Sequence, residues 1–262
     1  MLNFLRREGI DPGIIGEVQA FRNKYPTAEE LTGRVPVPRY LYYGREVWEE
    51  AITALLSGEN LLLVGPKATG KNVLAENLAA AFGRPSWDVS FYINTDAATL
   101  LGTDTFHDNR VTLRKGPIYQ CAEFGGFGVL DEINMAKNES LAVLHATLDF
   151  RRSIDMPAIT QEGLVKLLRR EFPDLRNNYA EQFAGLFQDL QKKCDGGELS
   201  TKPLDLRGLL AAVRLMHTGL EGNRALEMGL VNKSFDDFER QLVKDVIQTR
   251  LPEEIAYGDV FA

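Results

Sequence analysis

The sequence predicts an α/β fold with a parallel β-sheet sandwiched by helices, followed by a small all-helical domain. In the first part of the chain, short apolar runs alternate with helical patterns, an order typical of a parallel sheet with right-handed crossovers. From Ile159 onward, apolar residues recur at helical spacing and no convincing strand follows. We therefore expect an N-terminal segment at 1–38, an α/β core at 39–155 and a helical domain at 156–262.

The composition indicates a folded chain with a mildly acidic balance. Hydrophobic residues make up 44% of the 262 residues, which argues against disorder. The 37 acidic and 30 basic residues do not favour a nucleic-acid partner. The three histidines form no metal-binding pattern, and the two distant cysteines are expected to be free thiols. Because the sequence has no signal-peptide stretch and no apolar run long enough for a bilayer, we expect a cytoplasmic protein with no membrane span.

The elements before the first apolar run are a connector and a helix. The N-terminal segment ends near Pro36 and Pro38, which fix an extended connector, and we expect it to lie against the core. Residues 45–57 place their apolar side chains on one helical face, and Gly58 stands where a C-terminal cap belongs.

The core elements then follow in the order strand, helix, strand. Residues 61–64 are four apolar residues in a row, which is typical of a strand buried on both faces of a parallel sheet. The next segment is rich in Ala and Leu and should be a helix that Gly83 stops. The expected helices of the core are 71–82 and 138–150, and its other expected strands are 86–91 and 125–131.

The second half contains helical stripes and two candidate N-caps. Asp205 and Ser234 each precede an apolar stripe, and Ser234 with Asp237 resembles a capping box. The stripes are Leu164–Leu168, then Phe183, Leu186, Phe187 and Leu190, then Leu206–Met216, and finally Phe235–Ile247.

A glycine-rich loop between the first strand and its helix is the first candidate site. Gly65 and Gly70 let the backbone turn so that successive N–H groups and the helix N-terminus face a phosphate. Lys71 would reach the β- and γ-phosphates as a point charge. Asn72 stands where a Ser or Thr hydroxyl usually meets Mg²⁺, and it offers only a carbonyl oxygen. The alternative is a structural turn without a ligand. The candidate nucleotide-binding residues are Gly65, Pro66, Lys67, Ala68, Thr69, Gly70, Lys71 and Asn72.

Two acidic residues at the end of a later strand complete the candidate site. Open α/β sheets place their ligand chemistry at the C-terminal ends of strands. Asp131 can hold Mg²⁺ through water, and Glu132 can orient and deprotonate an attacking water. The alternative, two acids that merely end a strand in solvent, does not explain why both motifs stand at matching strand ends. The sequence therefore predicts an ATP site that uses Mg²⁺.

Several spaced segments resemble one protein family. The segments GPKATGKN, RKGPIYQCAEFGG, GVLDEINMAK and STKPLDLRGLLAAV occur in this order. They resemble the MoxR/CbbQ/NirQ branch of the AAA+ ATPases, in the dynein-related AAA subfamily, over roughly residues 39–262. The resemblance implies a P-loop NTPase core with a helical lid, and ATP hydrolysis that remodels or activates a partner protein. It also implies a ring, often hexameric, and a partner with a von Willebrand factor A-type domain.

The resemblance also implies roles for individual residues. Tyr43 and Gly44 fall where the backbone contacts adenine. Arg207 falls at the second sensor, which touches the γ-phosphate, although a solvated helix arginine is the alternative. Residues 94–118 fall at an insertion near the central pore. Asn134 matches the family's motif without a clear mechanism. The implied catalytic set is Lys71, Glu132 and Arg207.

One segment departs from the family. Between Arg151 and Ile159 the family carries roughly fifty residues that this sequence lacks, including a strand ending in the first sensor and the arginine finger. Loss of a central strand would leave a gap in the sheet with apolar edges exposed. Either the deletion is covalent or a real segment is missing from the sequence as written. We assign no finger to Arg151 or Arg152.

Three other functions compete with ATP-driven remodelling. A nucleotide-sensing scaffold with little or no turnover is favoured by Asn72 and by the absent segment. A small-molecule kinase would need a lid inserted between strands, whereas the helical domain here is C-terminal. A DNA helicase is disfavoured by the acidic charge.

Overall fold

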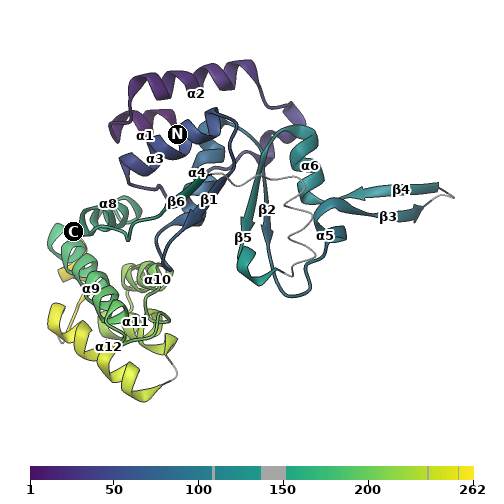
Figure 1. Cartoon of the computed structure of the whole chain (residues 1–262). Helices are drawn as coiled ribbons and strands as arrows, with labels where there is room; N and C mark the ends of the chain where they lie inside the picture. The colour runs from purple at the N-terminus through teal and green to yellow at the C-terminus, as the bar shows by residue number, and fades with distance from the viewer. Residues whose placement is uncertain (108–109, 137–151, 235, 253) are drawn as a thin grey trace. The chain divides into compact units, whose positions relative to one another are not determined.

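The computed structural model describes residues 1–107, 110–136, 152–234, 236–252 and 254–262. These residues form two compact units. The first contains Met1–Val64 and Gly70–Met156, and the second contains Gly65–Thr69 and Pro157–Ala262 (Figure 1). The expected helix at 138–150 and Arg151 lie outside the described residues. No described helix has both the length and the apolar character needed to cross a membrane.

The N-terminal segment is helical and belongs to the core of the first unit. Asp11 begins the second helix because its carboxylate accepts hydrogen bonds from the backbone N–H groups of Gly13 and Ile14. Phe4 and Val18 are buried in the same apolar cluster as Trp48. The elements are α1 (Leu2–Arg7), α2 (Pro12–Lys24), the 3₁₀ helix η1 (Glu29–Arg34) and α3 (Arg45–Leu56).

The strands of the first unit form two separate parallel pairs. The pairs are β1 (Leu61–Val64) with β6 (Arg152–Asp155), and β2 (Ser86–Ser90) with β5 (Phe127–Asp131). Their registers align Leu61 with Arg152 and Ser86 with Phe127. Among the described residues no ladder joins one pair to the other.

The expected burial of β1 on both faces is wrong. Leu61 and Leu63 pack against the core, but Leu62 and Val64 are 37% and 42% exposed. Successive side chains of a strand point to opposite faces, so one face of β1 is covered and the other is open. The elements packed on the covered face include α3 and α4 (Lys71–Phe82), and α4 ends at Gly83 as expected.

A β-hairpin lies within the range of the expected insertion at 94–118. Its strands β3 (Gly102–His107) and β4 (Arg110–Lys115) pair antiparallel and extend away from the other strands of their unit (Figure 1). Phe106 and Val111 are 72% and 67% exposed. The hairpin lies between α5 (Ala97–Leu101) and α6 (Pro117–Phe124), and a 3₁₀ helix η2 (Ile133–Met135) follows β5.

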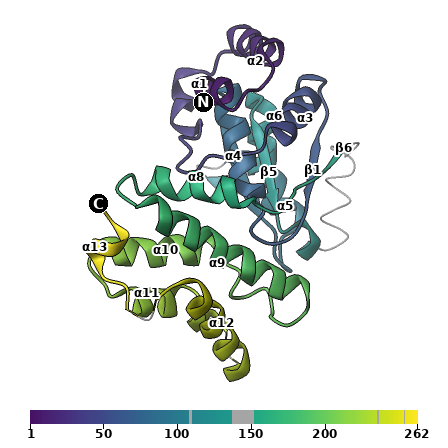
Figure 2. The same cartoon turned by 90° about the vertical axis from the view of Figure 1, so that its left-hand side faces the viewer.

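The second unit is built from helices around an apolar core (Figure 2). Phe183, Phe187 and Leu210 are almost fully buried. Helices α10 (Leu206–His217) and α11 (Gly222–Gly229) approach so closely that a Cβ on Gly208 would lie 2.2 Å from the carbonyl oxygen of Gly229. The elements are α8 (Gln161–Glu171), α9 (Asn177–Asp195), α10 (Leu206–His217), α11 (Gly222–Gly229), η3 (Val231–Lys233), α12 (Asp237–Arg250) and α13 (Tyr257–Val260).

One of the two expected N-caps is confirmed. The Asp205 carboxylate accepts from the backbone N–H of Arg207 at the start of α10. The cap at Ser234 is wrong, because α12 begins at Asp237 and its N-cap is Asp236, whose carboxylate accepts from the N–H of Glu239.

Candidate nucleotide site

The loop between β1 and α4 contains three residues with positive φ angles. Gly65, Ala68 and Gly70 have φ angles of 148°, 65° and 86°. An alanine in the left-handed region costs roughly 1–2 kcal/mol, so the surrounding turn must hold it there. The buried hydroxyl of Thr69 donates to the carbonyl oxygen of Pro66 at 3.0 Å and closes the turn.

Helix α4 begins at Lys71 without a side-chain cap. Its N-cap is Gly70, which has no side chain to satisfy the first backbone N–H groups. A helix start of this kind suits an anion, because the N–H groups and the positive end of the helix dipole point toward it. Lys71 stands at the first helical position, so its charge adds to the same end of the helix.

Asn72 and Asp131 are in direct contact across the first unit. The Asn72 amide nitrogen donates to Oδ2 of Asp131 at 2.7 Å. The other carboxylate oxygen of Asp131 accepts from the backbone N–H of Glu132 at 2.9 Å. Glu132 follows the end of β5 with a φ of 56°, and its side chain is exposed. The structure thus brings the loop helix and the paired acids together, as the sequence predicts.

The contact with Asp131 determines which atom of the Asn72 amide could meet a metal ion. A carboxylate oxygen only accepts hydrogen bonds, so the Asn72 atom that faces Asp131 is the amide nitrogen. The expected carbonyl ligand therefore points away from Asp131, and the amide must turn over to present it. With that change the oxygen set fits Mg²⁺, which takes one or two carboxylates together with phosphate oxygens and waters. Among the described residues, no group of three or more His, Cys, Asp or Glu side chains could hold a metal ion.

A buried asparagine on α4 holds the segment expected to contact adenine. Asn77 is fully buried; its Oδ1 accepts from the N–H of Tyr42 at 3.1 Å and its Nδ2 donates to the carbonyl of Tyr40 at 2.8 Å. The indole N–H of Trp48 donates to the Tyr42 carbonyl at 3.0 Å. Sequence reasoning missed Asn77, although one Asn within a helical run of Ala and Leu was a usable signal.

The residues on either side of this segment are closely packed. The Tyr42 ring lies beneath Gly70, where an added Cβ would be 3.2 Å from Cδ2, and burial raises the pKa of the Tyr42 phenol. Tyr43 meets the edge of the Phe4 ring at 5.6 Å between centroids, and Gly44 is the N-cap of α3. Backbone contact of Tyr43 and Gly44 with adenine stays a prediction.

The remaining predicted residues are exposed. The Arg207 side chain, in the second unit, is 88% exposed and its Nε lies 3.8 Å from Oδ1 of Asp205. Lys233 shares that carboxylate at 3.3 Å. Lys67 of the loop and Asn134 of η2 are also exposed. The sensor role of Arg207 stays a prediction.

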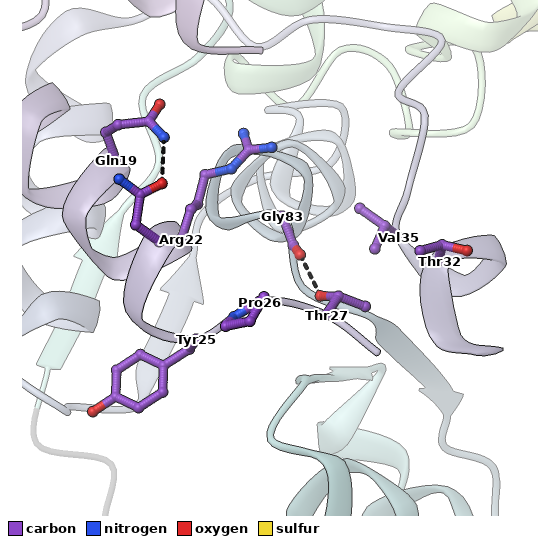
Figure 3. Close-up of a pocket in the computed structure, with 9 residues that line it drawn as sticks. Gln19, Arg22, Tyr25, Pro26, Thr27, Thr32, Val35 and Gly83 are labelled. Carbon is purple, nitrogen blue, oxygen red and sulfur yellow. Dashed lines mark hydrogen bonds between the residues drawn. The ribbon is translucent and has the colours of Figure 1, made fainter. Parts of the chain in front are cut away.

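A separate cavity of about 470 Å³ lies at the other end of α4 (Figure 3). The Thr27 hydroxyl donates to the carbonyl of Gly83 at 2.6 Å, and an Arg22 nitrogen donates to the carbonyl of Ala81 at 3.4 Å. A 12-residue helix is about 18 Å long, so this cavity is distinct from the loop at the first turn of α4.

One known protein family matches the part of the sequence that contains the candidate site. Residues 60–170 match the family described as AAA domain (dynein-related subfamily). This match supports an ATP-binding AAA+ ATPase with a P-loop NTPase fold. The matched range contains the loop at Gly65–Asn72 and the acids Asp131 and Glu132.

Three relatives from bacteria are similar over different shares of the chain. The uncharacterized protein YojN of Bacillus subtilis is 26% identical over 270 positions, covering 86% of this chain and 88% of that protein. The uncharacterized protein SH1500 of Staphylococcus haemolyticus is 26% identical, covering 80% and 97%. The uncharacterized protein SSP1341 of Staphylococcus saprophyticus is 33% identical over 123 positions, covering 45% and 47%.

The relatives carry residues that this chain lacks inside the aligned region. With YojN, 86% of 262 residues is about 225, so about 45 of the 270 aligned positions face no residue here. With SH1500, 80% is about 210, and about 47 of 257 positions are likewise unmatched. Both lengths agree with the roughly fifty residues whose absence the family resemblance implies.

Proposed function

We propose that this chain binds ATP with Mg²⁺ at the loop Gly65–Asn72 and uses ATP hydrolysis to remodel or activate a partner protein. The contact between Asn72 and Asp131 supports the site, because it joins the phosphate-binding helix to the paired acids. That contact lies within the range that matches an AAA domain.

Each side chain has a role that its chemistry permits. Lys71 and the first N–H groups of α4 would hold the phosphates by charge and hydrogen bonding. Asp131 and a turned Asn72 amide would hold Mg²⁺, which neutralises charge on the phosphate oxygens when it is bound. Glu132 is exposed one residue beyond Asp131, where its carboxylate can accept a proton from an attacking water.

A nucleotide-sensing scaffold with little turnover is the second candidate. The observation that favours it is the direction of the Asn72 amide, whose nitrogen rather than its oxygen faces Asp131. This hydrogen bond must break before the Asn72 carbonyl oxygen can bind Mg²⁺. The cost of breaking it would lower the affinity of the nucleotide site for the metal. Slow turnover would follow even where ATP binds well.

The partner and the assembly belong to the same proposal. The family resemblance favours a homo-oligomeric ring, often a hexamer, and a client with a von Willebrand factor A-type domain. In the proposed ring, Arg207 would act as the second sensor and ATP would favour association. Sedimentation with and without ATP tests this part, and a monomer at all concentrations would contradict it.

The first experiment separates binding from hydrolysis. Lys71→Ala should weaken ATP binding at least tenfold, because a charge-assisted contact with phosphate is lost. Glu132→Gln should bind ATP like the parent and release no phosphate, since it keeps the shape and loses the base. Calorimetry measures binding and a phosphate assay measures turnover. Lys192→Ala, an exposed lysine on α9, is the control and should change neither. Parent-like ATP binding by Lys71→Ala together with undiminished phosphate release by Glu132→Gln would show that the site is elsewhere.

The second experiment decides between the two candidate functions. Asn72→Thr supplies a hydroxyl ligand and removes the amide donor to Asp131, so Mg²⁺ should tighten ATP binding by several-fold more than in the parent. Asn72→Ala removes both groups and serves as the matched control. Titration of a fluorescent ATP analogue with and without Mg²⁺ gives the ratio. An unchanged ratio in Asn72→Thr would mean that Asp131 holds the metal alone.

A further inference from the structure

The ring of Tyr42 lies between the starts of two helices of the first unit. Gly44 is the N-cap of α3 and Gly70 is the N-cap of α4. A Cβ added to Gly44 would lie 3.0 Å from Cε1 of the ring, and one added to Gly70 would lie 3.2 Å from Cδ2. Ordinary carbon–carbon contacts are roughly 3.5–4.0 Å, so the ring leaves no room for a side chain at either glycine. Because Cε1 and Cδ2 belong to opposite edges of the ring, each edge meets one helix start.

Both backbone groups of Tyr42 are hydrogen-bonded to side chains of the same two helices. Oδ1 of Asn77, on α4, accepts from the Tyr42 N–H at 3.1 Å. The indole N–H of Trp48, on α3, donates to the Tyr42 carbonyl at 3.0 Å. Asn77 and Trp48 are fully buried, so breaking either bond would leave a buried polar group unpaired. Tyr42 is therefore fixed at its backbone as well as at its ring.

A fixed ring between two helix starts determines how closely they approach each other. An aromatic ring is rigid, and close-packed protein interiors resist compression. In the proposed ATP site, the start of α4 holds the phosphates, and Tyr43 and Gly44 are the predicted contacts with adenine. Among the described residues, none hydrogen-bonds to the backbone N–H or carbonyl of Tyr43, so both groups can bind a ligand. The separation between these two places must match the length of one nucleotide.

We propose that Tyr42 is a positioning residue that couples the start of α3 to the start of α4 and so fixes the separation between the adenine and phosphate ends of the site. The coupling itself is a property of the first unit, whereas its effect on ATP rests on the function proposed above. A preorganised separation favours a molecule that spans both ends, because less ordering is needed on binding. It gives no such advantage to a fragment that occupies one end.

The coupling is tested on the full chain without nucleotide. Tyr42→Met replaces the rigid ring with a flexible apolar side chain that can still fill the space. The amides that report on the two helix starts are those of Trp48, which donates to Gly44 at 3.2 Å, and Leu74, which donates to Gly70 at 2.9 Å. Hydrogen exchange followed by NMR should be faster at both amides by about tenfold, because each helix start opens locally more often.

Three further variants separate the rigid ring from general stability. Tyr42→Phe keeps the ring and should exchange like the parent at both amides. Tyr42→Leu also lacks the ring and repeats the test if the methionine variant does not fold, as judged by circular dichroism. Tyr179→Met changes a tyrosine of the second unit that is equally buried, and it should leave both amides unaltered. Faster exchange at one helix start alone, or at neither, would overturn the coupling.

The effect on ligands is measured with ATP and with its two parts. Calorimetry with Mg²⁺ gives the affinities for ATP, adenosine and inorganic tripolyphosphate. Tyr42→Met should bind ATP about tenfold more weakly and each fragment within about twofold of the parent, and Tyr42→Phe should restore ATP binding. An equal loss for ATP and tripolyphosphate would overturn the spacing role, since the ring would then support the phosphate end alone. A parent that binds no ATP would contradict the proposed function, while the exchange rates would still decide the coupling.

Discussion

The helices of the second unit and the strands of the first unit find partners for their backbone hydrogen-bonding groups in different ways. Helix α9 makes its hydrogen bonds within itself, and Phe183, Phe187 and Leu190 bury its apolar face. β1 depends on its neighbours, and among the described residues it has one paired edge and one covered face. A helix can therefore keep its structure when a distant part of the chain is lost, whereas a strand exposes its backbone at once.

The largest expected effect tests this difference in packing. Phe187→Ala in α9 should lower the free energy of unfolding by about 3–5 kcal/mol, because it leaves a cavity in a fully packed core. Leu62→Ala in β1 removes a smaller side chain that is 37% exposed, and it should cost less than about 1 kcal/mol. Chemical denaturation measures both. Equal losses would mean that β1 is as well covered as α9.

An effect of intermediate size is expected at Arg84, which joins segments of the first unit that lie far apart in the sequence. Arg84, only 9% exposed, donates to the carbonyls of Tyr25 at 2.8 Å and Phe124 at 2.7 Å, and also to those of Pro26 and Gly125. Arg84→Ala should therefore cost about 2–3 kcal/mol, since several charge-assisted hydrogen bonds are lost together. Arg84→Lys keeps the charge without the planar fork and should recover only part. Full recovery by lysine would show that the charge alone matters.

The smallest expected effect is a pH dependence in the second unit. The Ser200 backbone N–H donates to Glu239 at 2.7 Å and its hydroxyl donates at 3.1 Å. The hydrogen bond from the Ser200 N–H is the main cause that lowers the pKa of Glu239 below its ordinary value of 4.5. The stabilisation is present above that value and is lost as pH falls through the lower folded pKa. Glu239→Gln should thus lie below the parent in stability at neutral pH and approach it in acid. A difference that stays constant with pH would assign the effect to packing.

Local patterns predicted the elements that depend on nearby residues. The helix 71–82 and its stop at Gly83 match α4, because a helix and its cap are determined within a few residues. The cap at Asp205 was predicted for the same reason. The meeting of Asn72 with Asp131 also followed, because both residues stand just beyond the C-terminal end of a predicted strand, although the two strands belong to separate pairs.

The features that depend on distant residues were not predicted. The open face of Leu62 and Val64 reflects which helices reach β1, and four apolar letters in a row do not show this. Asp236 rather than Ser234 caps α12, because the choice between two nearby polar residues depends on where the preceding turn ends. The orientation of the Asn72 amide depends on its partner, Asp131, which lies 59 residues later in the chain.

Helix α4 fixes both the distance and the rotation between the side chains at its start and the buried Asn77. Lys71 and Asn72 are the first two residues of the helix. One to two turns later, Asn77 forms hydrogen bonds with the backbone of Tyr40 and Tyr42. Each helical residue advances about 1.5 Å and turns about 100°. Inserting one residue between Asn72 and Asn77 would swing the two side chains about a quarter-turn or more out of phase, even if every other residue were kept. The number of residues in this stretch is therefore as constrained as their identity.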